Sequence, residues 1–380
     1  MNFDWTSIES EMKTKVAALF DEAAARELEN LEDADLPGLK NTTLCFAGKL
    51  GALGYLALAQ GPGQVQECLT LAAAQEGPAK ASGSLFLALE TSARLFGGLL
   101  AGFGASAEQK EILEQIRQGR ILGAVALSEP GGDQPQAAPL CTARPTDAGF
   151  LVSGRKGFVT NGPLADWLAV GAKVDGQDAF FLVQPGQEGL AIGPRIKTLG
   201  YNGLAVSTVE LADVKVPTEL VLGPFGDDRA IKYLQATQDL VLAAAALGVL
   251  ARSLAEANAY ARRHHRGTKP IFSHQEVRFK VADMFTLFQS CQLLIYRAAW
   301  HSAVGDREAD VLIRCAKVFV AEASETTANL AMQIMAGQGY VSGNAVERGY
   351  REAKYAALAG TTSELSRMAI ASEILARHPA

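Results

Sequence analysis

The spacing of apolar residues changes twice along this chain of 380 residues, and these changes constrain its fold more than any single motif does. Up to about residue 120 the spacing is helical, as in the N-terminal stripe of Ile8, Met12, Val16 and Phe20. Between Ile121 and Leu222, short runs rich in Val, Phe and Leu alternate with Gly, Pro and Asp turns, which is typical of β-strands. From Arg229 onward the helical spacing returns.

The C-terminal part contains the clearest helical pattern. Its apolar residues alternate between spacings of four and three, which indicates the seam of a helix packed in a bundle. The seam comprises Val277, Val281, Met284, Phe288, Cys291, Ile295 and Ala298. We therefore predict an α+β protein with an N-terminal α-helical domain at 1–120, a middle β-domain of sandwich or barrel form at 121–228, and a C-terminal four-helix bundle at 229–380.

The composition argues against several classes of protein. Hydrophobic residues make up 48% of the chain and charged residues 20%, as in globular proteins that bury a core. The longest apolar run, Leu240–Leu250, is too short to span a bilayer, and the early acidic residues do not fit a signal peptide. We therefore expect a cytoplasmic protein with no membrane span. A net charge of −6 does not favour nucleic acid as a partner.

The cysteines and histidines do not suggest a metal site. The five cysteines are scattered without a CxxC pair, which favours reduced thiols. The five histidines lack metal-ligand spacing; His264 and His265 are adjacent and would point apart on a helix. We predict no bound metal.

The stretch from Gln333 to Arg367 carries the strongest functional signal. Gly337 and Gly339 follow an apolar helical run, where glycine permits a left-handed residue and a close backbone approach. The segment Gly360–Glu364 then reads as a helix start, with hydroxyl groups to cap it and an acidic first turn. Two such breaks, one helix apart, leave room for a flat ligand against the backbone.

This stretch resembles the C-terminal signature of the acyl-CoA dehydrogenase superfamily. The family pattern Gln-Ile-x-Gly-Gly-x-Gly-Tyr, then Val-Glu-Arg-x-x-Arg-Asp-Ala-Lys, then Tyr-Glu-Gly-Thr is matched closely except at one place. Gly360 falls on the position of the family's catalytic Glu. The resemblance spans roughly residues 40–376, and it implies the same order of helical, β and helical domains.

Two further segments resemble the family's flavin-binding motifs. Ala126–Asp133 is similar to Thr-Glu-Pro-x-Ala-Gly-Ser-Asp, two residues short, and implies that Leu127 and Ser128 contact the flavin ring. Gly154–Gly162 is similar to Gly-x-Lys-x-Trp-Ile-Thr-Asn-Gly. There the resemblance implies that an aromatic residue, here Phe158, packs on the flavin, and that Thr160 hydrogen-bonds it.

The resemblance also implies a FAD site shared between two subunits. Tyr260–Gln275 matches a family segment whose Arg and Phe reach the neighbour's FAD, but His264 and Gly267 stand at those positions. Arg266 is close enough in sequence to replace the lost charge, and His274 is retained. The remaining implied FAD contacts are Gln333 and Gly337 across the dimer, and Thr362 and Glu364 near the phosphates and adenine end. A homodimer or homotetramer follows, with a heteromer as an alternative.

The base is the open question. Dehydrogenation of a thioester needs a positioned carboxylate for the weakly acidic α-proton, and Gly360 cannot serve. Some family members carry this Glu on the first helix after the β-domain, where this chain has Gln238. Asp239 is the next residue, about 100° round the helix, and is our candidate for a relocated base. The alternative is that Asp239 is a solvated or ion-paired helix residue.

Three functions fit these observations. The first, which we adopt, is a FAD-binding oxidoreductase acting on an acyl thioester, carried by CoA or by a carrier protein, with an electron-transfer flavoprotein as a possible electron partner. Its base would be Asp239, water or the substrate. The second is a flavoprotein that performs elimination, cyclisation or oxygenation on a thioester. The third is a base-less partner subunit of a heteromeric acyl-CoA dehydrogenase.

Overall fold

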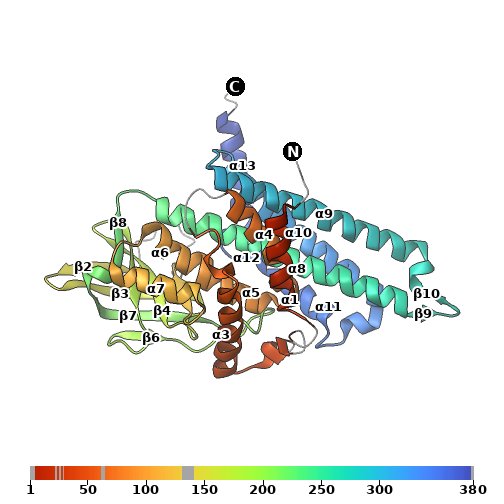
Figure 1. Ribbon diagram of the computed structural model, residues 1–380, viewed down its shortest axis with the longest axis horizontal. Coiled ribbons are helices and arrows are strands. Elements are labelled where there is room, and N and C mark those ends of the chain that lie inside the picture. The colour runs from red at the N-terminus through yellow and green to blue at the C-terminus, as the bar shows by residue number, and fades with distance from the viewer. Residues whose placement is uncertain are drawn as a thin grey trace.

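The computed structural model describes residues 5–21, 24, 27–28, 30–60, 65–130 and 141–377. Figure 1 shows helices from the N-terminal part, a β-sheet at one end of the molecule and long helices from the C-terminal part. The helical, β and helical order is therefore confirmed. Helix changes to strand between Arg117 and Gly123, and strand back to helix between Phe225 and Arg229. The domain boundaries at 120 and 228 stay predictions.

Short helices and capped turns build the N-terminal part. They are α1 (Ser7–Ala18), η1 (Asn30–Asp33), α3 (Leu36–Ala52), η2 (Tyr55–Ala57), α4 (Val65–Ala81), α5 (Gly83–Glu90), η3 (Thr91–Phe96), α6 (Gly97–Phe103) and α7 (Ala107–Arg117). Thr6 and Ser106 begin α1 and α7 with capping boxes, in which each hydroxyl accepts from a backbone N–H and a side chain reaches back. In the predicted α1 stripe, Val16 is buried and Ile8 is exposed.

The β-domain is one sheet folded over a shared apolar core. Its strands are β1 (Gly123–Ala126), β2 (Thr142–Thr146), β3 (Gly149–Thr160), β4 (Trp167–Val174), β5 (Gln177–Val183), β6 (Leu190–Ile192), β7 (Val206–Val216) and β8 (Val221–Phe225). The order is β6-β7-β3-β2-β4-β5-β8, with β1 paired to β4. A single pair, Thr142 with Lys173, joins β2 to β4. The two halves pack Val152 and Val209 in one core with Val170 and Phe181.

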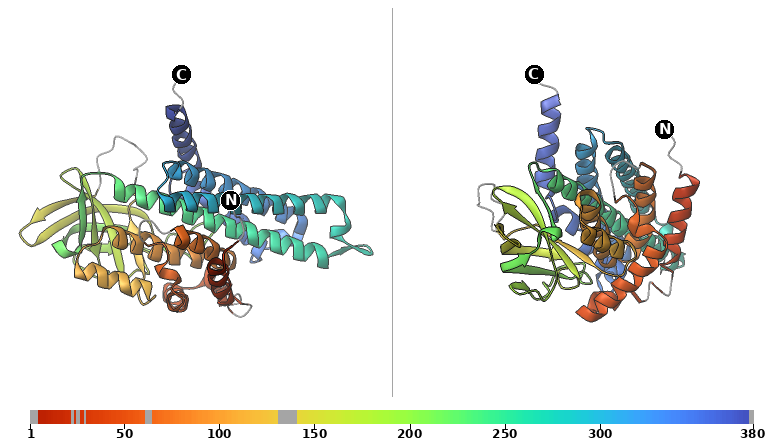
Figure 2. Two further views of the ribbon diagram at one scale, coloured as in Figure 1. Left: turned by 45° about the horizontal axis from the view of Figure 1, so that its top comes forward. Right: turned by 60° about the vertical axis from the view of Figure 1, so that its left-hand side comes forward.

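Long helices dominate the C-terminal part. They are α8 (Arg229–Arg263), α9 (Gln275–Val304) and α10 (Ala309–Met335), followed by η6 (Ala336–Tyr340), α11 (Ala345–Glu352), α12 (Tyr355–Leu358) and α13 (Ser363–Arg377). A hairpin of β9 (His265–Arg266) and β10 (Lys269–Pro270), with η5 (Ile271–Ser273), links α8 to α9. In the predicted α9 seam, Met284, Cys291, Ile295 and Ala298 are buried, as expected. Figure 2 shows α13 projecting from the body.

Among the residues that the structure describes, two helical stretches are long and apolar enough, by length and composition, to cross a membrane. They are Gly83–Phe103 and α8. Their apolar windows are 83% and 72% buried inside the protein, and core helices of folded domains pass the same test, so they are weak evidence for a span. The expectation of no span rested on Leu240–Leu250, which in the structure is only the middle of α8.

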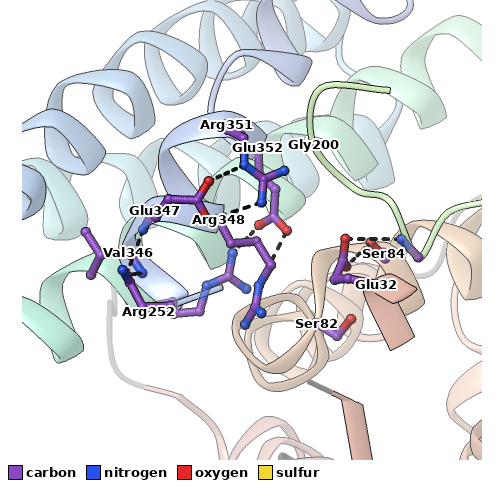
Figure 3. Close-up of polar contacts among 12 residues, drawn as sticks. Glu32, Ser82, Ser84, Gly200, Arg252, Val346, Glu347, Arg348, Arg351 and Glu352 are labelled. Atoms are coloured by element: carbon purple, nitrogen blue, oxygen red, sulfur yellow. Dashed lines mark hydrogen bonds and ion pairs between the residues drawn. The ribbon is translucent and has the colours of Figure 1, made fainter. Parts of the chain in front are cut away.

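A buried ion pair lies where the three parts of the chain meet (Figure 3). Arg252 of α8 donates to Glu352 at the end of α11, and both side chains are almost fully buried. Arg252 also donates to the carbonyl oxygen of Lys80 in α4, at 3.4 Å. A Cβ on Gly200, in the loop between β6 and β7, would lie only 2.9 Å from the backbone of Glu352. The loop can approach the pair this closely only because residue 200 is glycine.

The same loop is also bound to the N-terminal part. Glu32 accepts from the Ser84 hydroxyl at 2.6 Å and from the Gly203 N–H at 3.1 Å. Arg351 of α11 donates to the carbonyl oxygen of Leu199 at 2.6 Å. Residues 199–203 are thus held between Glu32 and α11 (Figure 3), which fixes the β-domain against both helical parts.

We predict that Glu352→Gln lowers the free energy of unfolding by roughly 3–5 kcal/mol, because it leaves the Arg252 charge buried without a counter-charge. The double variant Arg252→Met with Glu352→Leu should lose less, since it removes both charges. Urea unfolding followed by circular dichroism measures the effect. The control is Lys354→Met, which breaks the exposed pair with Glu325 and should cost only about 0–1 kcal/mol. Equal losses in Glu352→Gln and the control would contradict this account.

Candidate active site

A cavity of about 80 Å³ lies where the β-domain meets α5, η3, α8 and α12. Its β-domain wall carries Leu127, Ser128, Phe158 and Thr160, all of which the sequence predicts as flavin contacts. Gln238 of α8 and Tyr355 of α12 belong to the helical wall. The structure thus brings the two predicted flavin motifs together in one cavity.

Lys156 of β3 fixes the loop that follows β1. Its buried ammonium donates to the Leu127 carbonyl at 3.1 Å and to the Glu129 carboxylate at 2.7 Å. The Gly157 N–H donates to the Ser128 carbonyl at 2.9 Å. These bonds explain why the loop motif and the β3 motif occur together in the sequence: each holds the other. Gly131, Gly132 and Asp133 of the predicted loop motif lie outside the described residues.

Phe158 is exposed at an unusual backbone position. Its φ is +52°, in the left-handed region that large residues rarely adopt, and its side chain is 74% exposed. It lies at a register shift between β3 and β7, and such bulges re-aim side chains next to active sites. Both the left-handed backbone and the exposure to solvent are unfavourable for a Phe residue. Such a position is typical of a residue that packs on a ligand.

Thr160 and Asn161 end β3 beside the cavity. Thr160 hydrogen-bonds the phenol of Tyr355, whose pKa is raised by burial and lowered less by this bond. Asn161 is fully buried and donates to the Ala88 carbonyl at 2.7 Å and the Gly123 carbonyl at 3.3 Å. Tyr355 could not be predicted from the sequence, because its place beside Thr160 depends on how α12 lies against β3, and no local pattern records that contact.

Gly360 and Gln238 face each other. Gly360 has a φ of +64°, and a Cβ built on it would lie 3.3 Å from the Gln238 side chain and 3.2 Å from that of Leu242. Both of these α8 residues line the cavity. The two positions at which the resemblance places a base are therefore adjacent in space, and they are occupied by a glycine and an amide. The Gln238 amide cannot take up a proton, so Gln238 is not a candidate base.

Asp239 lies on another face of α8, away from this wall. Its side chain is almost fully buried, 3.4 Å from the ammonium of Lys317 in α10. Burial raises the pKa of Asp239, and Lys317 and Arg314 lower it less. Lys317 in turn donates to the carbonyls of Ala359 and Thr361, on either side of Gly360. Asp239 is thus ion-paired, as in the alternative expectation, because one step round α8 turns its carboxylate toward α10. Its role as a relocated base stays a prediction, and it does not line the cavity.

The other predicted FAD contacts lie away from the cavity or on its border. Arg266 and His274 are exposed at the hairpin, which Figure 1 places at the opposite end of α8 from the sheet. Gln333 near the end of α10 and Gly337 in η6 are exposed at that same end, where Ile271 packs with Ile334. One chain does not bring these residues to Phe158. Thr362 and Glu364 follow Gly360 directly, at the start of α13.

A second, larger cavity of about 590 Å³ lies between α4, α6, α8 and α9. Apolar side chains such as Leu71, Phe103 and Ile295 form much of its lining. Val241 lines both cavities, so α8 is the partition between them. The π-helical turn η3 lies along this partition, with Thr91 and Leu95 toward the first cavity and Arg94 toward the second. Such turns are rare and occur frequently at functional sites.

Sequence models of one enzyme family match both the β-domain and the C-terminal helices. Residues 124–214 match the middle domain of acyl-CoA dehydrogenases, and residues 236–375 match their C-terminal domain. The chain is 33% identical over 303 residues to a 3-(aryl)acrylate reductase of Clostridium sporogenes, covering 78% of this chain and 80% of that one. It is 32% identical over 305 residues to subunit CarC of the caffeyl-CoA reductase–Etf complex of Acetobacterium woodii, with the same coverage.

The fold agrees with these sequence matches. The structure of butyryl-CoA dehydrogenase from Megasphaera elsdenii superimposes with a TM-score of 0.86 over 99% of this chain and 100% of that chain, at 24% identity. This likeness shows the fold, and the family follows from the matched domains and the relatives. The chain belongs to the acyl-CoA dehydrogenase family of FAD-dependent oxidoreductases and is an acyl-CoA dehydrogenase-like flavoenzyme.

Proposed function

We propose that this protein binds FAD and an acyl thioester at the cavity between β3 and α8, and that it works without a carboxylate at either base position of its family. One observation carries the proposal. Gln238 lines the wall opposite Ser128, Phe158 and Thr160, and Gly360 lies so close behind it that a Cβ built on Gly360 would be 3.3 Å from the Gln238 side chain.

The residues present fit a flavin. Phe158 offers an exposed ring for a flat aromatic ligand, and Ser128 and Thr160 offer hydroxyl groups beside it. Lys156 and the Gly157 N–H hold the loop that carries Ser128. FAD, when bound, supplies an acceptor or donor for a hydride. The chain's own residues bind and orient the ring and form the thioester's side of the cavity.

Gln238 limits the proton transfers that residues of this cavity can perform. A carboxamide donates and accepts hydrogen bonds but does not take up a proton near neutral pH. Gln238 therefore orients a polar group of the substrate, and the α-proton must pass to water or to a group on the substrate itself. This favours thioesters whose α-proton is already acidic over simple saturated acyl chains.

The proposed assembly contains at least two copies of the chain. The exposed residues Arg266, His274, Gln333 and Gly337 lie at or near the β9–β10 hairpin, which Figure 1 places at the opposite end of α8 from the sheet. If they bind FAD, they do so for a second copy, which gives a homodimer or a dimer of dimers. We propose an electron-transfer flavoprotein as the redox partner, supported by the Etf-complex subunit among its relatives.

A second candidate is a base-less partner subunit of a heteromeric enzyme. Two observations favour it: His264 and Gly267 replace the Arg and Phe expected to reach a neighbour's FAD, and neither Gln238 nor Gly360 can act as a base. In that case a different subunit would complete the active site.

The spectrum of the purified protein separates these possibilities. We expect a yellow protein with bound FAD whose absorbance changes when a thioester is added anaerobically, with butyryl-CoA and caffeyl-CoA as first probes. A colourless protein that takes up no FAD would contradict the proposal and favour the partner subunit. A yellow protein that responds to neither saturated nor unsaturated thioesters would contradict thioester binding and favour other flavin chemistry.

Restoring a carboxylate tests the base directly. Gln238→Glu should raise the rate of flavin reduction by a saturated acyl-CoA by roughly 10² to 10⁴, the usual contribution of a positioned base. Gly360→Glu should give far less, because a side chain there adopts a left-handed backbone at a cost of about 1–2 kcal/mol and crowds Gln238 and Leu242. Stopped-flow absorbance measures both variants.

Gln235→Glu is the matched control for this experiment. It makes the same change one helical turn earlier on α8, at a residue outside the cavity lining, and should leave the rate unchanged. A Gln238→Glu variant that binds FAD and thioester without any gain would show that the missing base is not what limits the reaction.

A further inference from the structure

Lys317 is a buried charge that the proposed site does not use. It lies in the middle of α10, and its side chain has no exposure to solvent. Its ammonium donates to the Ala359 carbonyl at 3.0 Å and also to the Thr361 carbonyl. These two acceptors flank Gly360, the residue that faces Gln238 across the cavity wall.

Asp239 supplies the opposite charge. Its Oδ1 lies 3.4 Å from the Lys317 ammonium, and both groups are buried. A buried ammonium costs several kcal/mol unless acceptors and an opposite charge surround it, and here two carbonyls and one carboxylate do so. Two consecutive residues of α8 therefore point in different directions. Gln238 faces the cavity, and Asp239 faces α10.

We propose that Lys317 is a positioning residue that clamps the backbone around Gly360, with Asp239 as its counter-ion. The segment 359–362 connects α12 to α13 and belongs to neither helix. Lys317 holds this segment through hydrogen bonds to two of its carbonyl oxygens. Gly360 therefore stays next to Gln238, and the cavity keeps its shape. This inference rests on the proposed function, because it assigns the clamp to the thioester-binding wall.

The ion pair of Asp239 and Lys317 predicts how single and double variants should rank in stability. Lys317→Met leaves the Asp239 carboxylate buried alone, and Asp239→Asn leaves the Lys317 ammonium without its counter-ion, so each single variant should be less stable than the parent. The double variant Asp239→Asn with Lys317→Met removes both charges and should regain stability while losing the clamp. The double variant therefore separates the effect of losing the clamp on the loop from the effect of lower stability.

Amide hydrogen exchange tests the clamp without requiring activity. In the full-length protein with its FAD, the segment 355–366 contains two reporters: the Ala359 N–H, bonded to the Tyr355 carbonyl at 2.8 Å, and the Ser366 N–H, bonded to the Thr362 carbonyl at 2.9 Å. We expect the double variant to exchange these amides about tenfold faster, because hydrogen bonds to a charged group are lost from the adjoining carbonyls. Exchange in strands β3–β5 should not change.

Thioester affinity provides the functional readout. The dissociation constant for butyryl-CoA, measured from the flavin absorbance, should rise about tenfold in the double variant, in step with the loosened wall. Lys354→Met is the matched control: it makes the same substitution close to the loop, at an exposed lysine paired with Glu325, and should leave both readouts unchanged.

The outcomes separate the clamp from the proposed function. Unchanged exchange in the segment 355–366 of the double variant would overturn the clamp, and so would an equal rise throughout the protein, which indicates only lost stability. If the parent binds no thioester, the proposed function fails, but the exchange measurement still decides whether Lys317 holds the loop.

Discussion

The ion pair of Arg252 and Glu352 is the contact on which the arrangement of the molecule depends. It joins α8 to α11, and the loop from Leu199 to Gly203 lies against it so closely that residue 200 must be glycine. Glu32 holds the other side of that loop. The cavity needs this contact, because one wall comes from the β-domain and the other from α8 and α12. If the angle between the sheet and the helices were not fixed, the residues of the two walls would not stay opposite each other across the cavity.

The neighbouring faces of helix α8 contact different parts of the protein. Gln238 and Val241 form a cavity wall, Asp239 pairs with α10, and Arg252 binds α11. A helix buried on most sides can do this because consecutive residues are turned by about 100°. The charges on α8 that point into the protein are balanced by partners on α10 and α11, whereas the cavity face carries an amide and apolar groups. The uncharged wall opposite Phe158 is the feature that distinguishes this site from one built around a carboxylate.

Much of the fold, and the meeting of two motif segments at one cavity, could be predicted from the sequence. A helical apolar period located the helical parts, since burial of one helix face imposes it, and short apolar runs between Gly, Pro and Asp turns located the β part. The paired motifs located Leu127, Ser128, Phe158 and Thr160, because the two segments bind each other through Lys156. The direction of Asp239 could not be predicted, since a mostly buried helix has no polar face to indicate its rotation. Lys317 gave no signal, because it contacts the loop from 42 and 44 residues away.

The central claim is that this cavity holds a thioester without a base for its α-proton. Exchange of the α-protons of bound butyryl-CoA with deuterium from D₂O, followed by mass spectrometry, tests it most directly. The account predicts that the protein does not accelerate this exchange under conditions in which the thioester changes the flavin spectrum, and that Gln238→Glu does. Rapid exchange catalysed by the unmodified protein would contradict the account, because it would require a base that neither Gln238 nor Gly360 supplies.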